Sequence, residues 1–464
     1  MNVIWIVADT FRQDHVGAYG KMPGIFTPSL DALAGRGVRF NRHYAGGFPT
    51  MPTRADHATG RWTASFMTWE PLPDGVSTLA EVLAGEGVHT AAMVDTPFYL
   101  REGMNYDRGF QTFNMYSGQV GGGTLKTETA HHESEQARYA WRYESDRNVA
   151  RTITNAMEWL QLHYQEDFFL YIDTWDPHEP WDAPDYYTKL YMPEYDGELV
   201  HPIYGRWQEM PGYSAELVDK AHATYCGEVT MVDTWVGYLL RMVENMGLND
   251  RTAIIFTTDH GFYFGEHGGW FGKLQFAKKP DGSLYQFGES DAIWGFSPLY
   301  EELALIPLLI SAPGVEAGTY DGLTSVVDVM PTVLDLMGFE APSWVEGRSL
   351  LEKMRDTSLP GRDFTVTTVP FANPGDAVNA VDDRRRRMSH ANVTTVTTDD
   401  WALLYSPGDT RSELYNLKAD PTQESNVITQ YPERAEEIHE HLVDFMRETR
   451  LAPHMLEYRK QLLI

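Results

Sequence analysis

The chain has 464 residues, of which 42% are hydrophobic and 13% aromatic, a composition that suits a folded enzyme with one large and one small domain and excludes a disordered chain. Its formal net charge of -29 repels polyanions, so nucleic acid is not expected as a general partner, although a local positive pocket can still bind a small anion. The single cysteine, Cys226, excludes an internal disulfide framework.

Neither an export signal nor a membrane span is expected. No apolar run reaches the roughly 20 residues that cross a bilayer, and the chain enters an apolar run directly at Asn2, without a basic segment or a cleavage site. We therefore expect a soluble, cytoplasmic protein without a membrane partner. Cys226 lies in a stretch that reads as the interior of a helix, so we interpret its thiol as buried packing and not as a nucleophile.

The first predicted element is a strand over residues 3–8. Its continuous apolar run is typical of a parallel strand that is buried on both faces. The run ends in Asp9 and Thr10, and ligands gather at the carboxyl ends of the strands in open α/β sheets. Asp9 is therefore a candidate ligand, although an aspartate that hydrogen-bonds its own turn explains the residue equally well.

Residues 48–61 offer a hydroxyl, a guanidinium and the start of a helix. Pro52 fits the first helical turn, and Thr50 just before it can cap that turn, which would place its hydroxyl beside unpaired N–H groups and the positive end of the dipole. Arg54 returns to the same face one turn later and can hold a phosphate or sulfate oxygen with its planar fork. An ordinary threonine-capped helix is the non-functional alternative.

A second strand is predicted over residues 89–94, and Thr96 at its end fits a strand-end turn. Residues 121–144 begin with three glycines and are otherwise polar, which predicts an exposed insertion. The insertion could serve as a lid over a site or as an arm between subunits, so assembly into a homo-oligomer stays open.

A helix over residues 150–162 is followed by another buried strand over residues 168–172. Just beyond that strand, His178 lies between two prolines, which hold it in extended backbone and let it project into a cleft. It could then donate a proton to a leaving oxygen or contact an ester oxygen. A purely structural histidine is the alternative.

The stretch from Arg251 to Gly261 repeats the theme of the first strand, because it predicts a buried strand that delivers Asp259 and His260 at its carboxyl end. A helix over residues 221–246 precedes it. Lys273, taken alone, reads as a solvated surface charge.

A domain boundary is predicted within residues 351–360, which divides the chain into a catalytic domain over residues 1–355 and a C-terminal domain over residues 356–464. Alternating apolar residues predict antiparallel strands in the smaller domain, near residues 366–368, 393–398 and 401–405. A helix over residues 432–448 closes it. The basic run Arg384–Arg387 fits a solvated loop, or a contact with substrate or with another subunit.

Several of these segments together resemble the sulfatase family. Thr50-x-Pro52-x-Arg54, followed by Thr-Gly-Arg, resembles the family signature C/S-x-P-x-R with its T-G-R. Other stretches with family-like motifs cover most of the chain; they are residues 27–37, 173–181, 225–233, 257–268, 299–314, 326–350 and 413–426. The resemblance implies an alkaline-phosphatase-like α/β fold, in which a large mixed, mostly parallel sheet lies between helices and a smaller C-terminal α+β domain carries an antiparallel sheet.

The resemblance also implies a site for one divalent metal ion. Its ligands would be Asp9, Asp259, His260 and the Thr50 oxygen, which the metal would activate as a nucleophile. Two carboxylates and one imidazole suit Mg²⁺, Mn²⁺ or Ca²⁺, and zinc is also compatible. The spacing that supplies a second metal in two-zinc relatives is absent.

The substrate contacts are implied in the same way. The substrate would be a small anionic ester, with Arg54 and Lys273 contacting the anion and His178 protonating the departing alcohol. Thr96 could contribute a hydroxyl contact, as polar residues do in phosphonate monoester hydrolases. His267 would structure its loop.

Position 50 departs from the family, because sulfatases have a cysteine or serine there that is converted to formylglycine, and threonine cannot be converted. Thr10 likewise stands where relatives have a second acid or a glutamine. We therefore expect hydrolysis of phosphate mono- or diesters or of phosphonate monoesters through a threonine nucleophile. A sulfatase that works without formylglycine and a catalytically silent homologue that binds an anion or a partner are the alternatives.

Overall fold

The computed structural model describes residues 1–96, 100, 103–116, 141–283, 293–372, 377–379, 385–388, 392–407 and 411–464. The predicted insertion lies outside these residues up to residue 140, and so does Arg384. Within the described part, no helix is both long enough and apolar enough to span a membrane.

The centre of the molecule is a nine-stranded mixed sheet with the order β13-β2-β12-β7-β1-β5-β3-β4, in which β14 also pairs with β2. β12 is antiparallel to both of its neighbours, and the other pairings are parallel. This confirms the predicted mostly parallel sheet. The strands are β1 Asn2–Ala8, β2 Val38–Tyr44, β3 His89–Val94, β4 Thr112–Met115, β5 Phe168–Thr174, β7 Thr252–Thr257, β12 Leu305–Ser311, β13 Gly318–Tyr320 and β14 Thr324–Ser325.

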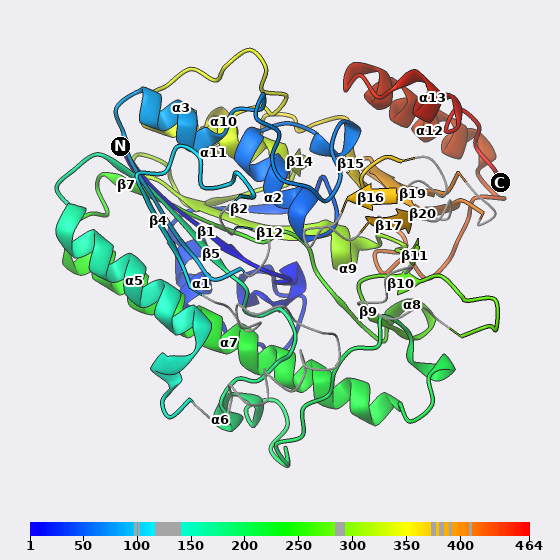
Figure 1. Cartoon of the computed structure of the whole chain (residues 1–464), viewed down its shortest axis with the longest axis horizontal. Coiled ribbons are helices and arrows are strands. Elements are labelled where there is room, and N and C mark those ends of the chain that lie inside the picture. Colours follow the sequence, from blue (N-terminus) through cyan, green and yellow to red (C-terminus); the bar gives the residue numbers. More distant parts are fainter. Residues whose placement is uncertain are drawn as a thin grey trace.

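Helices cover both faces of this sheet because successive side chains of its central strands point to opposite sides. Ile4 and Ile6 of β1 pack in one hydrophobic cluster with α1, α5 and α7, whereas Val3 and Trp5 pack in another with α3, α10 and α11. Figure 1 shows the two helical layers on either side of the sheet. These helices are α1 Pro28–Ala34, α3 Leu79–Gly85, α5 Asn148–His163, α7 Ala215–Asn245, α10 Val329–Met337 and α11 Leu351–Arg355.

A four-stranded antiparallel sheet with the order β15-β18-β19-β20 follows near the C-terminus, as predicted. Its inner face packs against α12 in a cluster that also contains Trp62 and Val326, so this core extends across the predicted boundary near residue 355. The division of the chain at that residue stays a prediction. The elements are β15 Thr365–Thr368, β18 Thr394–Thr397, β19 Trp401–Tyr405, β20 Glu413–Asn416, α12 Pro432–Glu448 and α13 Pro453–Glu457.

Two small sheets and several short helices complete the described structure. The sheet strands are β6 Gly205–Arg206, β8 Tyr263–Phe264, β9 Trp270–Gly272, β10 Gln275–Phe276, β11 Ile293–Phe296, β16 Ala377–Asn379 and β17 Arg385–Met388. The remaining helices are α2 Thr50–Thr59, α6 Asp185–Thr188, α8 Glu266–Gly269, α9 Glu301–Ala304 and the 3₁₀ helix η1 Gln13–His15, with further 3₁₀ turns at Gly17–Tyr19, Thr63–Ser65, Glu144–Asp146, Trp207–Glu209 and Val326–Asp328. The residues of the Arg384–Arg387 run that are described thus lie in β17.

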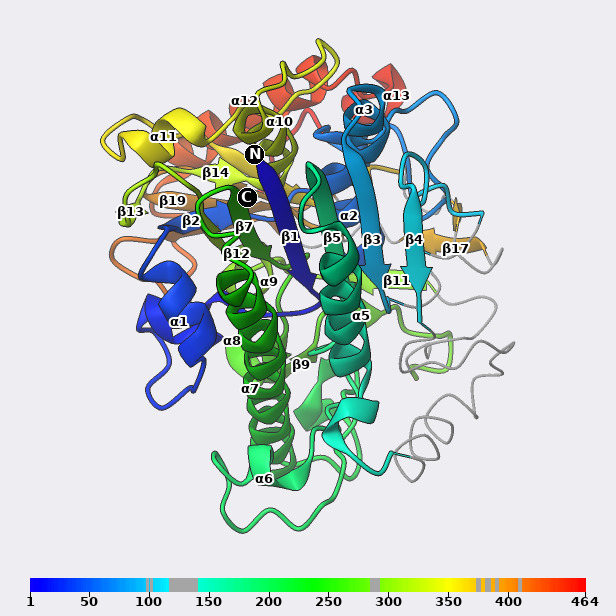
Figure 2. The same cartoon turned by 90° about the vertical axis from the view of Figure 1, so that its left-hand side faces the viewer.

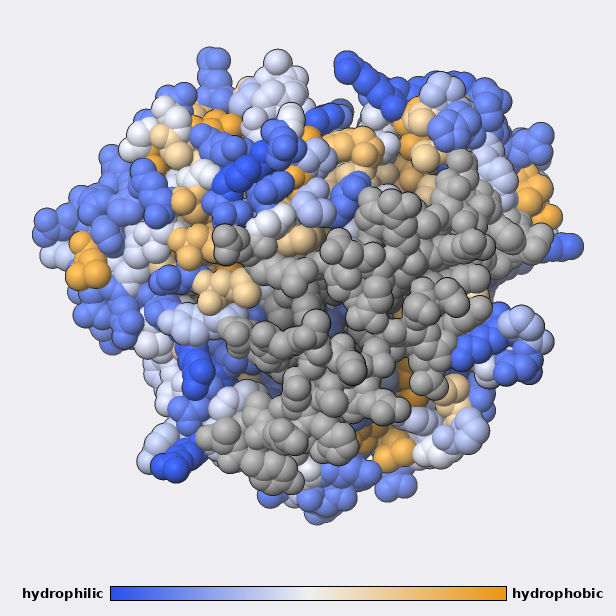
Figure 3. Space-filling model, viewed as in Figure 1, coloured by the Kyte–Doolittle hydropathy of each residue, from blue (hydrophilic) through white to orange (hydrophobic). Residues whose placement is uncertain are grey.

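The parallel strands end at one edge of the large sheet. β7, β1, β5 and β3 are neighbours and run in the same direction, which Figure 2 shows for β1 and β3. Polar residues that follow these strands in sequence therefore come together in space. Away from the grey atoms, the face seen in Figure 3 is largely hydrophilic with scattered apolar residues, in keeping with the strongly acidic composition.

Candidate active site

Three predicted metal ligands meet at this edge of the sheet. Asp9 follows β1, and Asp259 and His260 follow β7, the strand beside it. Each offers one ligand atom, and the three atoms lie within 4.8 Å of one another. All three side chains are fully buried. The convergence expected from the two strand ends is thus present.

Thr50 lies in the same site, but not as a helix cap. Pro49 occupies the N-cap position and Thr50 is the first helical residue of α2, so its hydroxyl makes no capping hydrogen bond. The predicted cap is wrong because the helix begins one residue earlier than the position of Pro52 suggested. The Thr50 hydroxyl instead lies 3.3 Å from Nε2 of His260.

His260 presents an unprotonated nitrogen to Thr50. Its Nδ1 lies 2.9 Å from the Gly261 carbonyl and donates to it, which leaves the lone pair on Nε2. Burial lowers the pKa of His260 to about 4 although Asp259 opposes the shift, so the ring is neutral near pH 7. Glycine is required at position 261, because a Cβ there would lie 1.8 Å from the Glu302 carbonyl oxygen.

Thr10 holds the two carboxylates in place. Its backbone N–H donates to Asp259 Oδ1 at 3.0 Å, and its hydroxyl donates to Asp9 Oδ1 at 2.5 Å. Its φ of 60° lies in the left-handed region, which threonine rarely adopts and which occurs preferentially at functional sites. Thr10 was not expected among the metal ligands, and the structure gives it this hydrogen-bonding role.

Arg54 is buried among three carboxylates. Its Nε and Nη2 donate to the two oxygens of Asp173 at 2.9 and 2.8 Å, and its Nη1 donates to Asp259 Oδ2 at 2.6 Å. The same Nη1 lies 3.0 Å from Asp9 Oδ2. The guanidinium therefore organises the carboxylates, and its predicted contact with a substrate anion stays a prediction.

Asp173 was not singled out from the sequence as a partner of Arg54. It lies near the end of β5, beside β1, and its carboxylate also accepts hydrogen bonds from the hydroxyls of Tyr171 and Thr96. The signal that could have identified it is its place on a strand parallel and adjacent to the one that precedes Asp9. Thr96 thus faces the site, and its contact with an ester stays a prediction.

The site fits a divalent cation. Asp9 Oδ2 is buried and, apart from its ion pair with Arg54 Nη1, receives no hydrogen bond from the described residues, and burial together with repulsion from Asp259 raises the Asp9 pKa well above its usual value. Two cations, Arg54 and Lys273, balance only part of the charge of the buried carboxylates. These carboxylates are Asp9, Asp173, Asp259 and Glu179. Hard oxygen ligands with one imidazole at Asp9, Asp259 and His260 match the predicted donor set.

His178 and Lys273 form a buried pair, although the sequence around Lys273 by itself predicts a solvated surface charge. Lys273 Nζ lies 2.6 Å from His178 Nε2, and the histidine Nδ1 lies 2.8 Å from the Glu179 carbonyl oxygen. Burial and then the Lys273 charge hold the His178 pKa well below its usual value. Lys273 Nζ thus donates a hydrogen bond to His178 Nε2, and the predicted proton donation by His178 stays a prediction.

Glu179 is a buried carboxylate that the sequence did not single out. Neither of its side-chain oxygens accepts a hydrogen bond from the described part of the chain. Oε2 lies 3.3 Å from His178 Nδ1, but that nitrogen donates to the backbone carbonyl. Burial raises the Glu179 pKa to about 6.

His267 has the structural role expected of it. Its Nε2 lies 2.8 Å from Glu302 Oε2, and its ring stacks on Tyr300 at a centroid distance of 3.7 Å. These contacts hold the loop between β8 and β9, and Lys273 comes directly after β9.

Comparison with known proteins identifies similar chains. A sulfatase family model matches residues 1–339. The chain is 23% identical to an ulvan-active sulfatase of Formosa agariphila over 92% of its own length and 77% of the relative's, and 24% identical to an arylsulfatase of Clostridium perfringens over 95% and 93%.

Among solved structures, the phosphonate monoester hydrolase of Agrobacterium radiobacter superposes with a TM-score of 0.73 at 20% identity. The match covers 97% of this chain and 96% of that one. The superposition confirms the expected alkaline-phosphatase-like fold.

Proposed function

The chain belongs to the sulfatase family of ester hydrolases, and we propose that it hydrolyses phosphate mono- or diesters or phosphonate monoesters with a metal ion and Thr50 as the nucleophile. The observation that carries this proposal is the Thr50 hydroxyl at 3.3 Å from His260 Nε2, beside the ligand atoms of Asp9 and Asp259. Phosphonate monoester hydrolases with the same fold support the choice of phosphorus esters.

The identity of residue 50 separates phosphorus chemistry from sulfatase chemistry. Threonine carries a secondary hydroxyl and cannot become the aldehyde that the family signature supplies for sulfate transfer. A positioned hydroxyl can attack phosphorus directly and form a phosphothreonine intermediate, which water then hydrolyses. Both steps are in-line displacements, and the protein contributes positioning and charge.

The chain's own residues place the reacting groups. The Thr50 hydroxyl lies 3.3 Å from His260 Nε2, the nitrogen whose lone pair a cation would take, so its oxygen lies beside the cation site and, after losing its proton to water, can attack the ester. The first N–H groups of α2 have no helical partner and can stabilise an anion beside Thr50. Lys273 holds a proton on Nζ for the departing alcohol. Asp9, Asp259 and His260 would hold a divalent cation, which would supply Lewis-acid stabilisation of the ester oxygens.

The proposal predicts a metal requirement. Activity of chelator-treated protein towards aryl phosphate, bis-aryl phosphate and aryl phosphonate esters should fall by at least about 10²-fold, because a bound cation contributes several kcal/mol to the transition state. Adding Mg²⁺, Mn²⁺ or Ca²⁺ one at a time should restore it. The measurement is the initial rate for each ester with each metal, with aryl sulfate assayed in parallel.

The same assays distinguish the alternatives. Faster hydrolysis of aryl sulfate than of all three phosphorus esters would show a sulfatase that works without formylglycine. Undetectable turnover of every ester, together with tight phosphate or sulfate binding, would show a silent homologue. Full activity in chelator would contradict the metal-dependent mechanism.

Lys273→Gln should slow hydrolysis of alkyl esters by about 10²- to 10⁴-fold, because a poor leaving group needs the proton held on Lys273 Nζ. Hydrolysis of esters with an acidic phenol as leaving group should slow much less. The measurement is kcat/KM across a series of leaving groups of increasing pKa. His178→Gln is the matched variant. If the slope of log kcat/KM against leaving-group pKa changes less in His178→Gln than in Lys273→Gln, the result supports Lys273 as the donor. A larger change would assign donation to His178.

A further inference from the structure

A second group of metal-ligating side chains lies outside the active site. His15 comes from η1, and His222 and Cys226 come from α7. One ligand atom from each lies within 4.8 Å of the other two. None of these residues contributes to the proposed hydrolysis.

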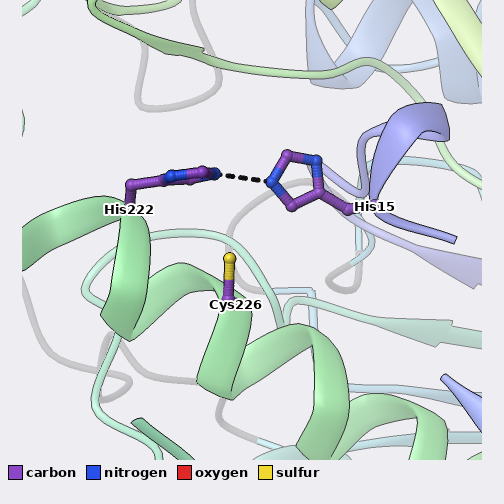
Figure 4. A group of neighbouring side chains, drawn as sticks. All are labelled: His15, His222 and Cys226. Carbon is purple, nitrogen blue, oxygen red and sulfur yellow. Dashed lines mark hydrogen bonds between the residues drawn. The ribbon is translucent and has the colours of Figure 1, made fainter. Parts of the chain in front are cut away.

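The three side chains point toward one another. His222 and Cys226 are four residues apart, which places them on one face of α7. Figure 4 shows the Cys226 thiol directed toward the two imidazoles, with His15 reaching in from the other side. The Nε2 atoms of His15 and His222 lie 2.7 Å apart. We propose that His15, His222 and Cys226 form a binding site for Zn²⁺ or a similar thiolate-preferring transition metal ion.

The hydrogen bond of His15 with Asp14 leaves Nε2 of His15 available to bind a metal ion. His15 Nδ1 lies 2.7 Å from Asp14 Oδ1 and donates to it, so Nε2 of His15 carries a lone pair. A carboxylate behind a ligating histidine is the usual second partner at zinc sites, because it fixes the tautomer and the ring orientation. The proton between the two Nε2 atoms then belongs to His222; metal binding would require this proton to move to Nδ1 of the same ring, so that a neutral imidazole offers its Nε2 lone pair, and the Cys226 thiol would release its proton to solvent. Arg12 pairs with Asp14 at 2.7 Å and holds that carboxylate in place.

The dimensions fit a zinc site after small movements. Zinc–nitrogen bonds of about 2.0–2.1 Å and a zinc–sulfur bond of about 2.3 Å with tetrahedral angles require about 3.3 Å between the nitrogens and about 3.5 Å from each nitrogen to sulfur. The present nitrogen–nitrogen distance is 2.7 Å, and no pair of ligand atoms exceeds 4.8 Å. Side-chain shifts of roughly 1 Å would therefore create the site.

The chemistry of this cluster differs from that of the active site. A thiolate and two imidazoles select Zn²⁺ or Co²⁺ over Mg²⁺ and Ca²⁺, which prefer carboxylate oxygens. His15 and Cys226 are buried, whereas His222 is partly exposed and leaves access for an ion and for a fourth ligand such as water.

The ion would also stabilise the segment that carries the active-site residues. Tyr225, which packs against the His15 ring, donates to the Thr10 carbonyl and accepts from the Arg12 N–H, both at 2.8 Å. Linking η1 to α7 through a metal would thus fix the loop that follows β1. The ion stabilises only the folded state, so thermal unfolding should shift upward with its concentration.

The test is a Co²⁺ titration of the full chain after chelator treatment, in excess Mg²⁺ and under reducing conditions. We expect thiolate-to-cobalt charge-transfer absorption in the near ultraviolet that saturates at one equivalent. Cys226→Ser should lose this absorption, and His222→Gln should weaken Co²⁺ binding at least about 10-fold. Asp259→Asn, which alters the active site instead, should retain it. Circular dichroism and ester hydrolysis check that Cys226→Ser is folded.

Three results would overturn the proposal: no charge-transfer absorption at one equivalent, its persistence in Cys226→Ser, or its loss in Asp259→Asn. Native mass spectrometry gives a second measurement on the unaltered chain. One zinc ion should stay bound in excess Mg²⁺ and should raise the temperature of unfolding, and a chain that retains no zinc under these conditions contradicts the site even if a variant fails to fold.

Discussion

Thr50→Ala should lower kcat for the preferred ester by about 10⁴-fold or more, with little change in the stability of the fold. The expectation follows from the position of the Thr50 hydroxyl, which lies 3.3 Å from His260 Nε2 beside the predicted metal ligands. Removing the nucleophile of a hydrolase typically leaves only the rate provided by binding and charge stabilisation. The measurement is single-turnover kinetics together with mass spectrometry of the quenched protein, which should show a phosphoryl group on Thr50 only in the unaltered chain.

Thr50→Ser is the matched control, because it keeps the hydroxyl and removes only a methyl group. It should retain activity within about tenfold and still form the adduct. Thr50→Cys, produced together with a sulfatase-maturation enzyme, tests the other chemistry: gain of aryl sulfate hydrolysis would show that residue 50 selects the ester. Undiminished turnover in Thr50→Ala would remove threonine from the mechanism.

The strands and the convergence of the metal ligands were predictable from the sequence for a physical reason. Continuous apolar runs of about six residues predict strands buried on both faces, and parallel strands end at a common edge. Asp9 directly follows one such run, Asp259 and His260 follow a second, shorter run after two threonines, and β1 and β7 are neighbours in the sheet. The local pattern and the direction of the strands therefore predicted that these residues meet at one edge, and the resemblance to sulfatases implied that they bind a metal.

The partners within the site were not predictable in this way, because they depend on contacts distant in sequence. Arg54 was expected to face an anion, yet it pairs with Asp173, which is 119 residues away. The hydrogen bond between Lys273 and His178 spans 95 residues. No periodicity or motif encodes which of several carboxylates a buried arginine meets, since this depends on the final packing of α2 against the sheet.

Local details were missed for a different reason. α2 begins one residue earlier than expected. Because of this shift, the Thr50 hydroxyl does not cap the helix and lies in the active site instead. The left-handed backbone of Thr10 likewise has no sequence signal, because glycine is the residue that normally marks such a conformation. Such conformations are stabilised by their surroundings, here by the hydrogen bonds to Asp9 and Asp259.

Arg54→Met should lower the free energy of unfolding by about 3–5 kcal/mol, because removing one partner of a buried ion pair leaves uncompensated charge. The guanidinium is 1% exposed and contacts the carboxylates of Asp9, Asp173 and Asp259. The measurement is urea unfolding followed by tryptophan fluorescence, in chelator so that metal binding does not contribute to stability. Unchanged stability would contradict the organising role of Arg54.

Two further variants separate the organising role from the predicted contact with the substrate anion. Asp173→Asn removes one buried negative charge. The double variant with Arg54→Met should therefore lose less free energy of unfolding than the two single variants lose in sum. Arg54→Lys keeps a positive charge but cannot form the bidentate pair with Asp173. If Arg54 acts only on the carboxylates, competitive inhibition by phosphate should weaken in parallel with metal affinity across these variants. If it also binds the anion, Arg54→Lys should weaken phosphate inhibition even when the metal is saturating, whereas Asp173→Asn should not.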